Sequence, residues 1–218
     1  MKVAILSESS ADEAAIRILV DAIHQAKTEP VPLFDPKSRG WPSVLKIVPA
    51  VIKYLHYRTD ADALVVVVDS NGTSPHNPQD EQTCAGTGCR LCKLRSAAQH
   101  TRERLPPLAG RAGLRLAFGL AMPAIEAWWL CGVDQSFGEA RWCRDLRAAP
   151  SRPPYAPRQL KARVYGTEQP ALPKETEKMV EAAERLARDI DLLCRQYPIG
   201  FGALAAAVRS WTSGQPRG

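Results

Sequence analysis

One run of residues constrains the fold more than any other part of this sequence. Residues 63–68 read Ala-Leu-Val-Val-Val-Val without a polar interruption, and the run stops at Asp69. β-branched residues favour strands, and a strand that shows no apolar–polar alternation is typical of a parallel sheet covered on both faces. We therefore predict a central, buried, parallel strand at residues 63–68.

Strands and helices alternate before this run. Residues 2–6 predict a short buried strand, and residues 30–34 predict a second strand, at an edge of the sheet because of its prolines. Apolar residues recur at helical spacing in residues 14–26, and again after Ser43, which we expect to cap the second helix. This order predicts right-handed crossovers and a doubly wound, mainly parallel α/β sheet.

The second half of the chain changes character. We expect a basic helix at 92–105, a fourth strand at 114–120, a helix that begins at Pro123, a proline-rich connection at 149–157, and helices at 173–196 and 200–211. We divide the chain into an α/β domain at 1–135, a helical extension at 136–211 packed on it, and a disordered tail at 212–218. The α/β domain includes a cysteine-rich loop at 73–92.

Composition narrows the class of partner. The chain of 218 residues carries a net charge of +6, which favours polyanionic partners such as nucleic acid. Its N-terminal apolar run, residues 3–6, is too short for a signal peptide, and no stretch approaches the roughly 20 apolar residues of a membrane span. We expect a cytoplasmic protein that does not enter membranes, with a protein partner or a homo-oligomer also open.

Acidic residues follow three of the predicted strands. Glu8 comes just after the first strand, Asp69 directly after the central strand, and Glu126 after the fourth strand, in the first turn of a helix. Ligands of open parallel sheets bind at the carboxyl ends of the strands, and Mg²⁺ prefers one or two carboxylates. These residues predict a site for Mg²⁺ or Mn²⁺. Each of them alone is also explained as a helix-capping or turn residue.

The same residues resemble a known family. An acidic residue after the first strand, followed by Asp69-Ser-Asn71 after a hydrophobic strand, is similar to the topoisomerase–primase (Toprim) fold, and the segment Pro-Ala-Ile-Glu-Ala-Trp at 123–128 resembles an uncharacterised Toprim-like family of bacterial proteins. The resemblance covers residues 1–135. It implies that Glu8 performs acid–base chemistry and that Asp69 and Asn71 hold Mg²⁺ during the cleavage or joining of nucleic-acid strands.

Two positions depart from the Toprim pattern. Ser9 replaces the glycine that normally follows the first glutamate, and Asn71 replaces a second aspartate. Asparagine is a neutral oxygen ligand, so the site carries one negative charge less, which Glu126 would restore if it reaches the same crevice. The sequence thus leaves two main hypotheses: a Mg²⁺-dependent, nuclease-like enzyme, or a non-catalytic Toprim-like module that binds nucleic acid or protein. A small-molecule phosphotransfer enzyme is a third option, which the basic charge does not particularly support.

Three of the six cysteines lie within nine positions. The spacing Cys84-x4-Cys89-x2-Cys92 is typical of a structural zinc site, for which His76 or His100 would be the fourth ligand. We favour His76, because it lies on the same loop. The alternative is a set of reduced surface cysteines, since a disulfide framework is rare inside cells. Arginines and lysines that follow the loop, and a second basic group at 158–163, are candidate phosphate contacts.

Overall fold

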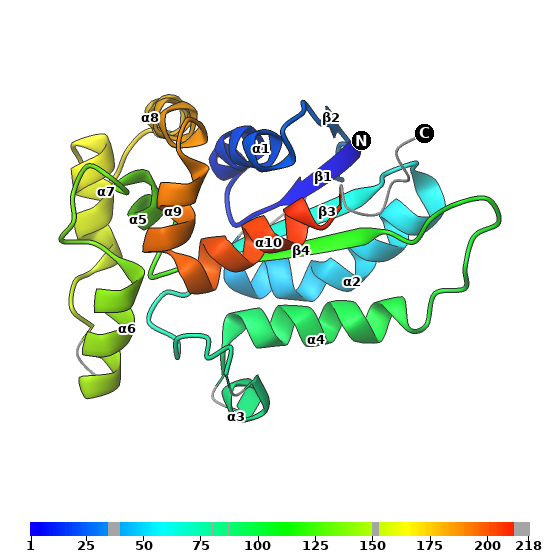
Figure 1. The fold of residues 1–218 in the computed structure, drawn as a ribbon, viewed down its shortest axis with the longest axis horizontal. Coiled ribbons are helices and arrows are strands. Elements are labelled where there is room, and N and C mark those ends of the chain that lie inside the picture. The colour runs from blue at the N-terminus through cyan, green and yellow to red at the C-terminus, as the bar shows by residue number, and fades with distance from the viewer. Residues whose placement is uncertain (35–39, 80, 87, 150–152, 212–218) are drawn as a thin grey trace.

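The structure is a computed structural model, which describes residues 1–34, 40–79, 81–86, 88–149 and 153–211. Four strands form a single sheet in the order β2-β1-β3-β4 (Figure 1). They are β1 (Lys2–Leu6), β2 (Glu29–Pro30), β3 (Ala63–Asp69) and β4 (Arg115–Ala121). Every neighbouring pair is parallel, with Leu6 opposite Val66 and Asp69 opposite Ala121. The expected parallel α/β sheet, with the run at 63–68 in a central strand, is confirmed.

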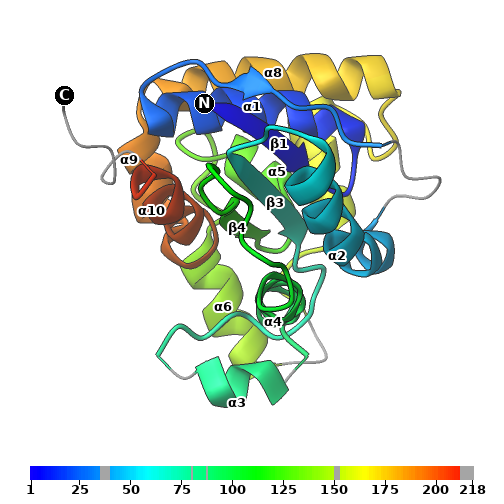
Figure 2. The same cartoon turned by 90° about the vertical axis from the view of Figure 1, so that its right-hand side faces the viewer.

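Helices cover both faces of the sheet (Figure 2). One face carries α1 (Ser10–His24), which packs on β1, and α10 (Ala203–Arg209), which packs on β4. The other face carries α2 (Trp41–Arg58) and α4 (Arg90–Arg102). An outer helix, α8 (Leu172–Ala187), lies along α1 rather than on the sheet itself. The chain beyond residue 135 therefore supplies part of the cover of one sheet face, through α10, and an outer layer on α1, through α8.

Shorter helices gather beyond the carboxyl ends of the strands (Figure 1). They are α5 (Glu126–Trp129), α6 (Glu139–Ala148), α7 (Pro157–Tyr165), α9 (Ile190–Gln196) and a π-helix at Pro198–Gly202. Their apolar residues continue the core of the sheet: Trp128, which is fully buried, meets Phe201 edge to face at 5.2 Å between ring centroids. Such aromatic pairs stabilise beyond their buried area. These elements close the end of the sheet at which parallel folds bind ligands.

Two expectations near the N-terminus are wrong in detail. The second strand is only Glu29–Pro30, because prolines at positions 30 and 32 remove the N–H groups that a longer ladder needs. Gly40, not Ser43, precedes helix α2, and its φ of 92° is one that glycine adopts without strain. Pro42 then occupies the first turn, where its missing N–H would have no helical partner anyway.

Other corrections concern the helices. The helix expected from Pro123 begins at Glu126 and is only four residues long, and the N–H of Ile125 just before it is bound by Asp69 Oδ1. The single helix expected at 173–196 is two helices, since Asp189 caps a new one by accepting from the N–H of Leu192 at 2.9 Å. The expected helix at 200–211 is the π-helix followed by α10. The loop expected at 73–92 contains α3 (Glu81–Gly86) and the start of α4.

Some expectations fall partly outside the described residues. The tail at 212–218 lies there, as do residues 150–152 of the proline-rich connection. Within the described ranges, no helix combines the length and the apolar composition needed to cross a bilayer.

Candidate functional site

Three of the predicted acidic residues meet at the carboxyl edge of the sheet. Glu8 follows β1, Asp69 ends β3, and Glu126 opens α5 after β4. Glu8 Oε1 accepts a hydrogen bond from the backbone N–H of Asp69 at 2.9 Å, and Asp69 Oδ1 accepts one from the N–H of Ile125 at 2.9 Å. The strand ends are therefore connected through the carboxylates themselves.

Two acidic residues that the sequence reasoning missed join this group. Asp12, in the first turn of α1, is 6% exposed, and Glu175, in the first turn of α8, lies close enough to act on its charge. An acid in the first turn of a helix that directly follows a strand was a signal for Asp12, whereas nothing in the sequence linked Glu175 to the sheet. We call Glu8, Asp12, Asp69, Glu126 and Glu175 the acidic cluster.

Within the described part of the chain, the acidic cluster has more negative than positive charge around it. Burial, and then the charges of Glu126 and Glu175, raise the pKa of Asp12 to about 8. Burial, followed by Glu126 and Glu8, holds the pKa of Asp69 well above its usual value, and burial also raises the pKa of Glu126. Desolvation and like charges both disfavour the ionised carboxylate. At neutral pH the cluster would be stabilised by any cation that enters it.

Two basic side chains flank the cluster. Arg90 Nη1 donates to Glu8 Oε1 at 3.3 Å and to the carbonyl oxygen of Asp69 at 2.8 Å. On the opposite side, Lys161 Nζ lies 3.6 Å from Glu126 Oε1 and 3.2 Å from Glu175 Oε1. Among the described residues, two cations against five carboxylates leave the cluster negative when every group is ionised. Lys161 belongs to the basic group at 158–163 that the sequence assigned to phosphate contacts, and the structure places it against carboxylates instead.

Glu126 is the residue of the acidic cluster whose hydrogen bonding is least complete. The residue is 2% exposed, and its Oε1 accepts from the Tyr165 hydroxyl at 3.4 Å. Its Oε2 is buried and has no hydrogen-bond partner among the described residues. A buried carboxylate oxygen without a partner costs free energy, so this atom is the point at which the cluster most needs a ligand.

Asn71 stands apart from the other predicted ligands. It is exposed, with a φ of 45°, and its backbone N–H donates to the carbonyl oxygen of Pro123 at 2.8 Å. In the described part of the chain, moreover, no three carboxylates lie as close together as the cysteine and histidine ligand atoms below. The structure thus provides a negative cluster rather than a ready-made Mg²⁺ or Mn²⁺ ligand set.

A second cluster combines all three predicted cysteines with His76. Cys84 lies on α3, Cys89 directly before α4 and Cys92 in its first turn, while the His76 loop follows β3. The sulfur atoms of these cysteines lie 3.6, 3.6 and 3.5 Å from His76 Nδ1, and all four atoms lie within 4.8 Å of one another. We call these residues the cysteine cluster. His100, the alternative ligand, is exposed farther along α4.

The cysteine cluster has the dimensions of a tetrahedral zinc site. With Zn–S bonds of about 2.3 Å and a Zn–N bond of about 2.05 Å, tetrahedral angles place nitrogen and sulfur ~3.5 Å apart. The three distances from His76 Nδ1 match this separation. Burial raises the pKa of Cys92 to about 12 and also raises that of Cys89, so these thiols ionise at neutral pH only with a metal. The cluster can therefore hold a metal such as zinc.

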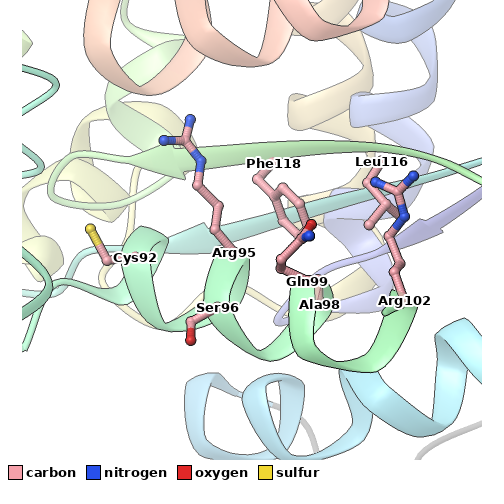
Figure 3. Close-up of a pocket in the computed structure, with 8 residues that line it drawn as sticks. All are labelled: Cys92, Arg95, Ser96, Ala98, Gln99, Arg102, Leu116 and Phe118. Carbon is pink, nitrogen blue, oxygen red and sulfur yellow. The ribbon is translucent and has the colours of Figure 1, made fainter. Parts of the chain in front are cut away.

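A basic groove runs between α4 and β4 (Figure 3). Its volume is about 500 Å³, and Arg95 and Arg102 project from α4 on either side of the Phe118 ring from β4. The two arginines are seven residues apart, which is roughly 10 Å along a helix. Cys92 lines one end, so the groove begins beside the cysteine cluster. We call this feature the α4–β4 groove.

Comparisons of the chain with protein-family models, with curated proteins and with solved structures gave no match. The functional interpretation therefore depends on the two clusters and the groove.

Proposed function

We propose that this protein processes phosphodiester bonds of nucleic acid with a divalent cation, Mg²⁺ or Mn²⁺, held in the acidic cluster. The observation that carries the proposal is Glu126 Oε2, a buried carboxylate oxygen without a partner among the described residues, at the end of the sheet where parallel folds bind ligands. Hard carboxylate oxygens are the ligands that these cations prefer. A bound cation would polarise the phosphodiester and activate water.

The residues of the cluster divide this work between them. Asp69 and Glu126, whose pKa values burial raises, are the proposed cation ligands, because a cation offsets the charge that burial opposes. Glu8, with 16% of its side chain exposed, is the proposed proton acceptor and donor, as the Toprim resemblance implies. Arg90 holds Glu8 in place through its bond to Oε1.

The α4–β4 groove supports nucleic acid as the substrate. Arginines beside an exposed aromatic ring are the usual combination for single strands, since the guanidinium groups neutralise phosphates and the ring stacks on a base. Phe118 is partly exposed between Arg95 and Arg102 (Figure 3). Helix α4 connects the groove to the acidic cluster, because Arg90 at its start contacts Glu8 and Asp69.

We further propose that the cysteine cluster holds a structural zinc ion. Four protein ligands complete a tetrahedral shell and leave no open position for catalysis. Three thiolates and Zn²⁺ carry a net charge of −1, and Arg95, with Nη1 3.5 Å from His76 Nε2, lies close enough to offset it.

Cleavage assays with matched variants test the proposal. Plasmid and single-stranded DNA are incubated with Mg²⁺ or Mn²⁺ and the protein, or with Glu8→Gln, Asp69→Asn or Glu126→Gln. Cleavage by the protein and its loss in all three variants is the expected result. Glu184→Gln, an exposed glutamate on the same helix as Glu175, is the control and should cleave normally.

One observation favours the non-catalytic alternative. Glu8 Oε1 already accepts hydrogen bonds from Arg90 and from the Asp69 N–H. Both bonds are explained by a structural role of Glu8, without a role as a catalytic base. Salt-sensitive binding of single-stranded DNA without cleavage at any cation concentration would reject the enzyme and favour a binding module.

A further inference from the structure

The cysteine cluster and the acidic cluster are adjacent in the chain at two points. His76 lies seven residues after Asp69, and Cys89 directly precedes Arg90. The cysteine cluster therefore ties the loop that leaves β3 to the beginning of α4. Any metal bound there fixes the two segments that bring Asp69 and Arg90 together.

The start of α4 packs into the core through Leu91 and Leu94, which are fully buried, but lacks the polar contacts that usually cap a helix. Cys89, its N-cap residue, makes no side-chain capping hydrogen bond, and the first turn contains no acidic residue. Both features normally stabilise the beginning of a helix. The preceding helix, α3, has six residues, too few to be stable without tertiary contacts. The metal ligands Cys89 and Cys92 would therefore supply the polar anchor that the first turn of α4 otherwise lacks.

Arg90, which directly follows Cys89, connects the start of α4 to the acidic cluster. Its side chain is 11% exposed, and its guanidinium donates to Glu8 Oε1 and to the carbonyl oxygen of Asp69. The guanidinium also lies 4.9 Å from the centroid of the Trp41 ring, at a distance at which a cation and an aromatic face attract. A shift of α4 at Cys89 would move Arg90 out of all three contacts.

We propose that zinc at His76, Cys84, Cys89 and Cys92 positions Arg90 in the acidic cluster, so that loss of zinc releases Glu8 and the end of β3. Arg90 is a positioning residue in this arrangement: it neutralises Glu8 and braces the Asp69 carbonyl. The proposal depends on the zinc occupancy proposed above and does not depend on catalysis.

Hydrogen exchange measured by mass spectrometry tests the coupling without any activity. The compared proteins are the zinc-loaded chain, Cys92→Ser and Arg90→Ala, each with its zinc content determined. Cys92→Ser should lose zinc and exchange faster at residues 89–95 and at residues 69–71. Arg90→Ala should keep its zinc and its protection at 92–95, yet exchange at least about tenfold faster at 69–71, because the charge-assisted bonds to the Asp69 carbonyl oxygen and to Glu8 are lost.

Two controls separate zinc from general damage. Cys194→Ser, a partly exposed cysteine outside the cluster, and His100→Ala should leave zinc content and exchange at 69–71 unchanged. The double variant Cys92→Ser/Arg90→Ala should exchange at 69–71 no faster than Cys92→Ser alone. Zinc loss that leaves residues 69–71 protected, or additive effects in the double variant, would overturn the proposal.

Binding of Mn²⁺ gives a second readout that simple destabilisation would not produce. Removing Arg90 takes a positive charge away from Glu8, so Arg90→Ala should bind Mn²⁺ about tenfold more tightly, and Cys92→Ser should show the same gain. Unequal gains in the two variants would contradict a shared route through Arg90. Absence of Mn²⁺ binding in every variant, with the exchange results as expected, would reject the proposed function and retain the coupling.

Discussion

Replacing Asp12 with asparagine tests the charge balance of the acidic cluster. Asp12 is 6% exposed, and burial with its acidic neighbours raises its pKa from 3.8 to about 8. The folded state then binds a proton more tightly than the unfolded state, so the free energy of unfolding falls as pH rises from about 4 to about 8. At about 1.4 kcal/mol per pKa unit, the full difference corresponds to roughly 6 kcal/mol, of which roughly 5 kcal/mol is lost by pH 8, where the folded-state carboxyl is half ionised.

An asparagine at this position would keep the shape of the side chain and remove its charge. Asp12→Asn should therefore match the wild-type protein closely at pH 4.5 and exceed its stability by up to ~5 kcal/mol at pH 8. Urea denaturation at these pH values, in buffers without free divalent cations, measures the free energy of unfolding of both proteins. Part of the fall with pH remains in the variant, because burial also raises the pKa of Glu139 to about 7.

Divalent cations provide the control for this experiment. A cation that binds only the folded state stabilises the protein. At pH 8, Mg²⁺ or Mn²⁺ should therefore raise the free energy of unfolding of the wild-type protein by a large part of what it lost with rising pH. The same cations should raise the free energy of unfolding of Asp12→Asn by less. The reasoning is refuted if wild-type stability does not fall between pH 4.5 and 8, or if Asp12→Asn is the less stable protein at pH 8.

Three further substitutions have defined outcomes. Gly200→Ala should lower the free energy of unfolding by about 3 kcal/mol, because a Cβ would lie 1.9 Å from the Leu120 carbonyl oxygen. Gly138→Ala has open space around it and should change the free energy of unfolding little. Thermal melts of the two variants measure the difference. Arg111→Ala should cost about 3 kcal/mol in urea denaturation, because its guanidinium donates to four backbone carbonyls around the end of α2, and an unchanged midpoint would contradict this. Asn71→Asp should tighten Mn²⁺ binding in calorimetry by less than about tenfold, because Asn71 is exposed and charges in solvent interact weakly. An unchanged affinity would show that a charge at position 71 does not act on the acidic cluster.

The sheet was predictable because local sequence patterns identify its strands. The uninterrupted run at 63–68 is buried on both faces in β3, as its lack of alternation indicated. Helix α7 was not predicted, because it is mostly polar and buries only Leu160 and Tyr165. Helix α6 was also not predicted, although Trp142, Cys143 and Leu146 lie at helical spacing and are buried, so here a local signal was missed.

Some residues of the candidate site were likewise predictable from local sequence patterns, and others were not. Glu8 and Asp69 were predicted from their places at strand ends, and His76 from the short loop that it shares with the cysteines. Arg90 and Lys161 were not assigned to the acidic residues, because their partners lie far along the chain: Arg90 is 82 residues from Glu8. Contacts of this kind follow from the packing of helices on the sheet and leave no local pattern in the sequence.

A crystal of the zinc-loaded protein soaked in Mn²⁺ is the most direct test of the central claim. We predict an anomalous manganese peak about 2.1 Å from Glu126 Oε2, a typical distance for a small hard cation, with Asp69 as a further ligand. Manganese bound only elsewhere, or a Glu126 Oε2 that stays without a cation at saturating Mn²⁺, would contradict it.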